Sequence, residues 1–322
     1  MTSEFDLIRR YFARPRATSG RARLGIGDDA ALLRVAAGAE FAVTTDTLVE
    51  GVHFLRGTDP TRLGHKALAV NLSDLAAMGA VPRYALLALT LPTANARWIG
   101  AFSRGFFRLA QRYGVELVGG DTTRGPLSIT LTAIGEVPAG QALRRDGAKA
   151  GDDIWVSGTL GDAALGLAAL QGRIRLTGRN RQYCVECLEA PQPRVVLGRA
   201  LRGIATAAID LSDGLVGDLR HICERSGLSA DVWFDYLPRP DQIGACRTMA
   251  LAREVLLAGG DDYELLFTAP PRARKRIERA GFGNGVMVTR VGTIKRGPAG
   301  RVRVYEGSTL VRPPRGGYDH FR

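Results

Sequence analysis

Long hydrophobic runs are missing from this chain of 322 residues. No apolar stretch reaches the roughly 18 to 20 residues that a membrane-spanning helix requires. The first ten residues mix acidic and basic side chains and do not resemble a signal peptide. We therefore expect a cytoplasmic protein that has no membrane partner.

Cysteine and histidine are both scarce, with four residues of each. Four cysteines are too few for a disulfide scaffold in a chain of this length. Cys184 and Cys187 form a C-x-x-C pair, but no second pair follows at the spacing of a zinc site, and residues 183–188 favour a helix. No Ser-His-Asp arrangement and no metal-binding histidine pair is visible. We therefore expect neither thiol chemistry nor a nucleophilic triad.

The net charge of +12 comes mainly from dispersed arginine. The basic stretches at 9–23 and 272–279 lack interleaved aromatic residues and known nucleic-acid motifs. We interpret this charge as an arginine-rich surface that could assist the capture of anionic substrates, and we expect no nucleic-acid partner. A nucleotide-sensing or nucleic-acid-binding protein without catalytic activity is the alternative from a different class.

The chain is long enough for two domains of ordinary size. Strands alternate with helices in both halves, which predicts α/β or α+β layers. The clearest early elements are strands at 40–45 and 84–91 and helices at 61–78 and 96–113. A connector rich in glycine and charge follows at 139–153, so we place an N-terminal domain at residues 1–138 and a C-terminal domain at 150–322.

Aspartate gathers in short, glycine-punctuated segments between apolar runs. Six such segments occur, at residues 25–29, 44–47, 71–74, 119–123, 210–214 and 259–262. Carboxylates that converge must be neutralised, and hard divalent cations together with phosphate do this well. Each segment alone is weak evidence, but together they predict a polyphosphate site.

Side-chain periodicity adds detail at two of the segments. In a strand, Thr44 and Asp46 point to one side while Thr45 points to the other. Asn71 and Asp74 lie three residues apart and therefore share one face of the predicted helix. That face is apolar, so a carboxylate there needs a partner. Both segments are suited to a metal site.

The segment at 210–214 allows two interpretations. Asp210 and Asp213 bracket Ser212, although their spacing is not that of an EF-hand loop. Asp213 and Gly214 could instead cap a helix that begins near Leu215. The sequence leaves both a metal site and a helix cap open.

Three further segments are less specific. Residues 25–30 match the dinucleotide fingerprint formally, but no strand–turn–helix unit surrounds them, so Asp28 or Asp29 bridges a metal or the segment is a plain turn. Gly119 and Gly120 allow close approach to a ligand after a buried strand, beside Asp121. His53 lies in a loop, in contact either with a substrate or with solvent. No P-loop and no protein-kinase motif is present.

Together these segments resemble the bacterial thiamine-monophosphate kinases, in the superfamily that includes aminoimidazole ribonucleotide synthetase. The resemblance runs from Phe5 to Phe321 and includes all six acidic segments, residues 68–79 and 119–126, and the terminal residues 317–321. It implies an α/β (α+β), two-domain aminoimidazole ribonucleotide synthetase-like fold. It also implies an N-terminal domain that pairs in a homodimer and a C-terminal α/β domain that closes over the site.

The resemblance further implies ATP-dependent phosphorylation of thiamine monophosphate to thiamine diphosphate, the final step of thiamine diphosphate biosynthesis, with Mg²⁺ as the cofactor. Mg²⁺ is expected at Asp29, Thr44, Thr45, Asp46, Asp74, Asp121, Asp210 and Asp213. ATP is expected at Gly120, Asp121, Arg145 and Ser212, and the thiamine moiety at His53, Asp261 and Tyr318. Asp46, Asp121, Asp213 and Arg145 are the expected catalytic residues.

The resemblance leaves one substrate contact and two rival enzymes open. Relatives are expected to carry Glu where this chain has Asp261, so a water molecule could bridge the shorter side chain to the substrate. Superfamily enzymes with a reactive terminal cysteine fit poorly, because the first cysteine is Cys184 and the chain ends at Arg322 without one. An aminoimidazole ribonucleotide synthetase fits the fold but not the terminal residues 317–321.

Overall fold

The computed structural model describes residues 4–13, 22, 26, 30–31 and 33–313. The chain divides into two compact units. The first comprises residues 1–75 and 80–140, and the second comprises residues 76–79 and 141–322. Among the described residues, no helix combines the length and apolar character needed to cross a membrane.

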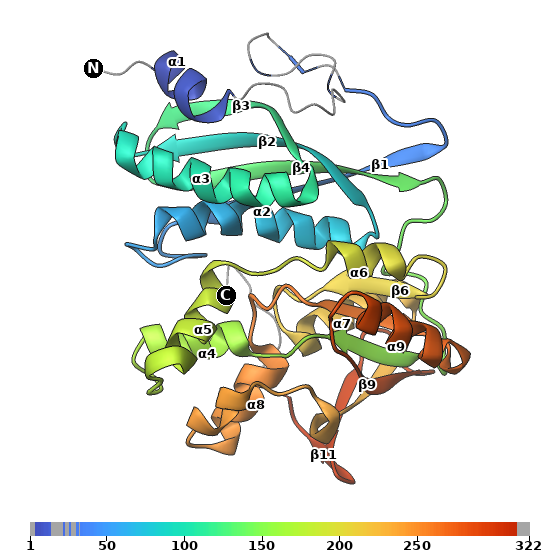
Figure 1. Cartoon of the computed structure of the whole chain (residues 1–322). Coiled ribbons are helices and arrows are strands. Elements are labelled where there is room, and N and C mark those ends of the chain that lie inside the picture. The colour runs from blue at the N-terminus through green and yellow to red at the C-terminus, as the bar shows by residue number, and fades with distance from the viewer. Residues whose placement is uncertain (1–3, 14–21, 23–25, 27–29, 32, 314–322) are drawn as a thin grey trace. The chain divides into compact units, whose positions relative to one another are not determined.

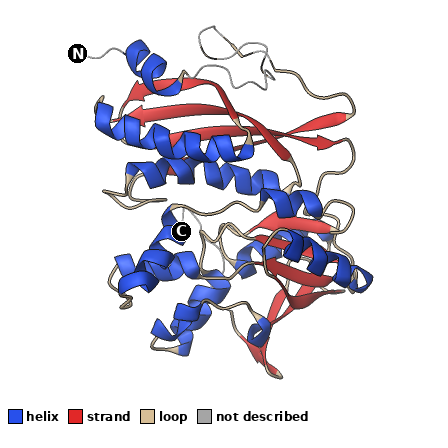
Figure 2. Ribbon diagram, in the orientation of Figure 1, coloured by secondary structure: helices blue, strands red, loops and turns tan. Residues whose placement is uncertain are grey.

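The first unit is built on a four-stranded sheet in the order β1-β4-β2-β3. Its strands are β1 (Ala39–Val49), β2 (Val81–Leu91), β3 (Glu116–Arg124) and β4 (Ser128–Pro138). Only β2 and β3 run parallel to each other; β4 is antiparallel to both of its neighbours. Two long helices, α2 (Pro60–Ala77) and α3 (Ala96–Tyr113), lie along one face of this sheet (Figure 1 and Figure 2). A short helix α1 (Glu4–Leu7) and a π-helical turn (Ile8–Phe12) precede the sheet.

The two faces of this sheet differ in burial. The row formed by Asp46, Leu131 and Leu87 faces the helices, and the two leucines in it are 1% and 5% exposed. The next row contains Thr47 and Ala88, which are both exposed. The expected alternation of Thr44 and Asp46 against Thr45 is therefore confirmed.

Two strands are longer than the sequence suggested. β1 remains paired with β4 from Ala39 to Val49, so Asp46 lies inside the strand rather than at its end. β3 pairs with β2 through Gly119, Gly120 and Asp121, which we expected to follow the strand. Continuous cross-strand pairing extends both strands beyond their apolar residues.

Local signals set the ends of the two long helices. The carboxylate of Asp59 accepts hydrogen bonds from the amides of Thr61 and Arg62 and caps α2. Asn95 caps α3 by accepting from two amides, and Gly114 ends that helix with φ of +67°. The helices expected at 61–78 and 96–113 are confirmed.

Two glycines set the approach of α2 to α3. A Cβ on Gly64 would lie 2.0 Å from the carbonyl oxygen of Phe102, and one on Gly105 would lie 1.8 Å from that of Thr61. Neither position has room for a side chain. The helices can therefore pack at this distance only with glycine at both positions.

The second unit is built on a seven-stranded sheet in the order β11-β10-β7-β9-β5-β8-β6. Its strands are β5 (Asp153–Ser157), β6 (Ala207–Asp210), β7 (Ser229–Trp233), β8 (Leu265–Ala269), β9 (Val288–Lys295), β10 (Val302–Glu306) and β11 (Thr309–Val311). Only β7 and β10 pair in parallel. The sequence predicts strands at residues 154–157, 206–209, 230–234, 263–268 and 286–291, which correspond to β5, β6, β7, β8 and β9, whereas β10 and β11 were not expected.

Six α-helices accompany the second sheet in the described part of the chain. They are α4 (Asp162–Leu170), α5 (Gly178–Glu189), α6 (Val195–Ala200), α7 (Leu215–Ser226), α8 (Met249–Ala258) and α9 (Arg274–Gly283). Leu215, Leu219 and Ile222 of α7 pack into the main core with Ile154 and Leu266 of the sheet. The sequence predicts helices near 162–170, around Tyr183 and Val195, and at 215–226 and 272–280, which correspond to α4, α5, α6, α7 and α9, whereas α8 was not expected. The sheet and its helices confirm a mixed α/β architecture.

Candidate functional site

The first acidic group joins strand β1 to helix α2. Thr44 Oγ1 donates a 2.5 Å hydrogen bond to Asp74 Oδ2, and Asp46 hydrogen-bonds the same carboxyl group. Burial and the negative charge of Asp74 raise the pKa of Asp46 to about 7. Two acidic side chains are thus held together where their joint ionisation is unfavourable unless a cation is present.

The surroundings of this group fit Mg²⁺. Asn71, one helical turn before Asp74, is fully buried, and its Oδ1 has no hydrogen-bond partner among the described residues. Carboxylate, amide and hydroxyl oxygens are the ligands that Mg²⁺ accepts, usually together with water and phosphate. No set of three or more His, Cys, Asp or Glu side chains in the described ranges is arranged to hold a metal ion. Within the described residues this group supplies two carboxyl groups and a hydroxyl, a set of donors that fits an ion whose other ligands are phosphate and water.

Asp121 lies elsewhere in the first unit. It is in register with Ala88, which pairs with Thr130 and through it with Thr47, on the face opposite to Asp46. Three strand spacings, about 14 Å, separate β1 from β3. Thr45 also lies on this opposite face, where its hydroxyl is 2.8 Å from that of Thr132. One copy of the first unit therefore does not bring Asp46 and Asp121 to the same ion.

Glycine is required at the position before Asp121. Gly120 has φ of +149°, and a Cβ there would lie 1.9 Å from the carbonyl oxygen of Leu87. The missing side chain lets the backbone of β3 lie close to that of Leu87 on β2. The close approach of a ligand at this segment stays a prediction.

His53 lies in the turn after β1 and has a defined orientation. The amide of Val49 donates a 3.0 Å hydrogen bond to His53 Nδ1. In the neutral imidazole the proton then resides on Nε2, which can donate to a ligand. Lys66 Nζ donates to the carbonyl oxygen of His53 at 3.4 Å. The ring is therefore not a freely rotating side chain of a solvated loop.

A second acidic group lies in the second unit, around the N-terminus of α7. Asp218 is 2% exposed, and its Oδ2 accepts the amide hydrogen of Asp213 at 3.1 Å. Burial, followed by the charges of Asp210 and Asp213, raises the pKa of Asp218 well above its ordinary value, while Arg145 acts in the opposite direction. The structure thus brings Asp210, Asp213 and Arg145 together, as expected, and adds Asp218.

The sequence analysis missed Asp218, although a signal was present. Asp218 lies three residues after Leu215 and four before Ile222, both of which are core residues, so it is on the buried face of α7. The alternative interpretation placed the cap of this helix at Asp213 and Gly214, and Gly214 is the N-cap residue. Gly214 has no side chain with which to cap the helix amides.

Asp261 lies directly against the loop that carries Ser212. Its amide donates to the carbonyl oxygen of Ser212 at 2.9 Å, and the amide of Tyr263 donates to that of Leu211 at 2.8 Å. The hydroxyl of Tyr263 donates to Asp261 Oδ1 at 3.1 Å. The residue expected to contact substrate is therefore attached to the loop expected to meet ATP.

Asp28, Asp29 and Tyr318, which the sequence analysis singled out, lie outside the described residues.

Cys184 and Cys187 lie on α5 as free thiols, which confirms the expected helix. Burial and the nearby charge of Asp162 raise the pKa of both thiols to about 12. These thiols are therefore protonated and poorly reactive at neutral pH.

Family models match most of the chain. Residues 27–137 match the model described as AIR synthase related protein, N-terminal domain. Residues 149–305 match the model described as AIR synthase related protein, C-terminal domain. Apart from residues 76–79, which belong to the second unit, the first matched segment lies in the first unit, and the other matched segment lies in the second.

Individual relatives indicate the group within this family to which the chain belongs. The thiamine-monophosphate kinase of Salmonella typhimurium LT2 is 48% identical over 319 residues, which is 99% of this chain and 98% of that protein. The crystal structure of the Stenotrophomonas maltophilia K279a enzyme of the same name has a TM-score of 0.84 and 47% identity, and covers 91% of this chain and 93% of that one. The structure of AaThiL complexed with AMPPCP and TMP has a TM-score of 0.76 and 31% identity, with 89% of each chain covered. The chain belongs to the AIR synthase related family and, within it, to the thiamine-monophosphate kinases.

Proposed function

We propose that this chain phosphorylates thiamine monophosphate to thiamine diphosphate with ATP as the phosphoryl donor. Its relatives over nearly the full chain are thiamine-monophosphate kinases, and AaThiL binds AMPPCP and TMP. The observation within the structure that carries the proposal is the pair of carboxyl groups of Asp46 and Asp74, held against Thr44. Such a pair is suited to a divalent cation that accompanies a polyphosphate.

The reaction requires little from the protein beyond positioning and charge neutralisation. The acceptor is already an anionic phosphate oxygen, so no general base is needed. Bound Mg²⁺ neutralises phosphate oxygens and so reduces repulsion between the two anions. We assign its ligands in the described part of the chain to Thr44, Thr45, Asp46, Asp74, Asp121, Asp210 and Asp213, and outside it to Asp29. Arg145, held beside the second acidic group, would stabilise charge on the transferring phosphoryl group.

The substrates have separate attachment points in this proposal. The backbone at Gly120 and the loop of Ser212 would bind ATP, together with Asp121 and Arg145. His53 Nε2 and Asp261 would contact the thiamine moiety, as would Tyr318, which lies outside the described residues. The fixed His53 ring and the attached Asp261 loop support these two roles.

We further infer a homodimer. β1 is an edge strand of 11 residues, and its outward face carries Phe41 and Val43 with 40% and 62% of their surface exposed. A long edge with exposed apolar side chains favours pairing with another chain. In addition, Asp121 does not reach Asp46 within one copy, so we propose that it serves the site of the partner.

Asp46→Asn tests the metal-binding role directly. We expect the rate of thiamine diphosphate formation from ATP, Mg²⁺ and thiamine monophosphate to fall about 10²- to 10³-fold, because a charge that binds the metal is removed. Asp59→Asn is the matched control, since asparagine also caps a helix and Asp59 is an N-cap rather than a proposed ligand.

The Asp59→Asn control should fold and should form thiamine diphosphate at the wild-type rate. An Asp46→Asn variant with unchanged kcat would remove that residue from the site. A wild-type protein that makes no thiamine diphosphate, but forms aminoimidazole ribonucleotide from its precursor, would overturn the proposed function.

A further inference from the structure

Residues 259–264 form a loop whose backbone is held in an unfavourable conformation. Asp261 has φ of +67° and Tyr263 has φ of +50°. Residues other than glycine rarely adopt this left-handed region, because Cβ crowds the backbone. Contacts from the surrounding structure must therefore keep the loop in place, and Asp262 lies between the two unfavourable positions.

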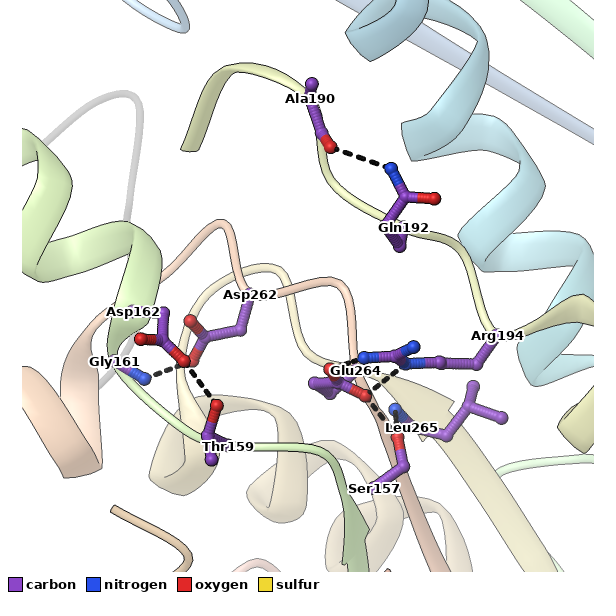
Figure 3. A network of polar contacts seen from close by, with 10 residues as sticks. All are labelled: Ser157, Thr159, Gly161, Asp162, Ala190, Gln192, Arg194, Asp262, Glu264 and Leu265. Atoms are coloured by element: carbon purple, nitrogen blue, oxygen red, sulfur yellow. Dashed lines mark hydrogen bonds and ion pairs between the residues drawn. The ribbon is translucent and has the colours of Figure 1, made fainter. Parts of the chain in front are cut away.

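Asp262 caps a helix that is distant in sequence. Its Oδ2 accepts the amide hydrogen of Gly161 at 2.8 Å (Figure 3). The amide of Ala163 also hydrogen-bonds this carboxyl group. These amides lie at the N-terminus of α4, whose N-cap residue is Gly161 and provides no side-chain cap. The carboxyl group of Asp262 thus satisfies amides that would otherwise lack partners.

A second acid, Asp162, lies near the carboxyl group of Asp262. Figure 3 shows the carboxyl groups of Asp262 and Asp162 turned toward one another. The Oδ1 atoms of both are shielded from solvent and have no hydrogen-bond partner in the described part of the chain. Asp162 is 5% exposed, and Thr159 donates to its Oδ2. Burial raises the pKa of each acid, and the charge of Asp162 further raises the pKa of Asp262.

The ends of the loop are held by other contacts. Asp261 and Tyr263 bond through their amides to the carbonyl oxygens of residues 212 and 211. Glu264 accepts hydrogen bonds from Ser157 and Arg194 (Figure 3). Between these ends, the Asp262 side chain links the loop to the N-terminus of α4 through the hydrogen bond from the Gly161 amide. The direction of the Asp261 carboxyl group therefore depends on it.

We propose that Asp262 is a positioning residue that presents Asp261 to the thiamine end of the substrate by holding the 259–264 loop against the N-terminus of α4. The inference rests on the proposed function and assigns a role to a residue that touches neither substrate nor metal. It concerns binding of thiamine monophosphate and leaves ATP binding unaffected. A general loss of folding would weaken both.

A double-mutant cycle tests this role. We expect Asp262→Ala to raise the KM for thiamine monophosphate about tenfold, the scale of losing one hydrogen bond to a charged group, with the KM for ATP unchanged. Asp262→Asn should restore the wild-type value, because its amide oxygen can still accept from the amides of Gly161 and Ala163. In an Asp261→Ala background, Asp262→Ala should cause no further increase.

The possible outcomes distinguish a failure of the positioning role of Asp262 from a failure of the proposed function. Equal effects of Asp262→Ala with and without Asp261, or an Asn variant as impaired as the Ala variant, would overturn the positioning role. A wild-type protein without thiamine-monophosphate kinase activity would instead overturn the proposed function. If Asp262→Ala does not fold, Asp262→Ser takes its place in the cycle, since its shorter side chain cannot reach both amides.

Discussion

At the scale of single residues, several acidic side chains of the second unit are stabilised by partners far away in the sequence. Glu264 is 6% exposed and accepts hydrogen bonds from Ser157 Oγ at 2.5 Å and from Arg194 Nε at 2.7 Å. A second guanidinium nitrogen of Arg194 also bonds this carboxylate. A buried carboxylate of this kind is tolerated only while its partners remain.

Removing Arg194 should therefore destabilise the folded protein. We expect Arg194→Met to lower the free energy of unfolding by about 3 kcal/mol, because Glu264 would be left buried without its main counter-charge. Urea denaturation measures this change. Arg173→Met is the matched control, since Arg173 and Glu254 pair with side chains that are 47% and 50% exposed, and its cost should stay below about 1 kcal/mol. Similar losses in the two variants would contradict the argument.

Contacts between residues that are near in the sequence could be predicted, whereas contacts between distant residues could not. Periodicity placed Thr44 with Asp46, and Asn71 with Asp74, because both patterns depend only on nearby residues. The partner of Asp262 is Gly161, 101 positions away in the chain, and no periodicity relates two such segments. Asp218 lies between these two cases. Helical periodicity places it on the apolar face of α7, but it does not predict that Asp210 and Asp213 lie nearby.

At the scale of elements, helix ends were predictable and strand ends were not. Asp59, Asn95 and Gly114 mark the ends of α2 and α3 by local hydrogen bonding and backbone conformation. Strand β3 continues through Gly119 and Gly120, which usually indicate a loop, because β2 supplies paired partners on one side. Strand length thus depends on a neighbouring strand that the local sequence does not specify.

Substituting alanine for either glycine of the α2–α3 contact should change stability in the direction opposite to that usual for a helix. Alanine normally stabilises a helix relative to glycine by up to about 1 kcal/mol. At Gly64 and Gly105 we expect the opposite, a lower thermal midpoint for each alanine variant, because the new Cβ would lie 2.0 Å or less from a backbone oxygen of the facing helix. Gly283→Ala on α9, where no atom lies within 4 Å of an added Cβ, is the control and should not be destabilised.

At the scale of the whole molecule, the positions of Asp46 and Asp121 on opposite faces decide what a working site requires. They lie three strands apart, on rows of opposite orientation. A site that uses both residues must therefore draw one of them from a second copy. The proposed homodimer supplies that copy, and a two-fold axis would create two equivalent shared sites.

Mixing inactive variants tests this arrangement. In a mixed dimer of Asp46→Asn and Asp121→Asn chains, one shared site carries both substitutions and the other carries neither. With random exchange, half of the dimers are mixed and each has one intact site, so co-refolding the two variants should restore about one quarter of wild-type activity. Sites built within single chains would each retain one substitution, and the mixture would stay as inactive as its components.

The matched control for this experiment mixes Asp46→Asn with Asp74→Asn. These residues belong to the same acidic group of one chain, linked by a direct hydrogen bond, so every site in a mixed dimer would contain one substitution. Thiamine diphosphate formation should therefore not recover. Recovery in this control as well would indicate reversion or carry-over of wild-type protein, whereas recovery only in the Asp46→Asn and Asp121→Asn mixture requires that two chains complete one site.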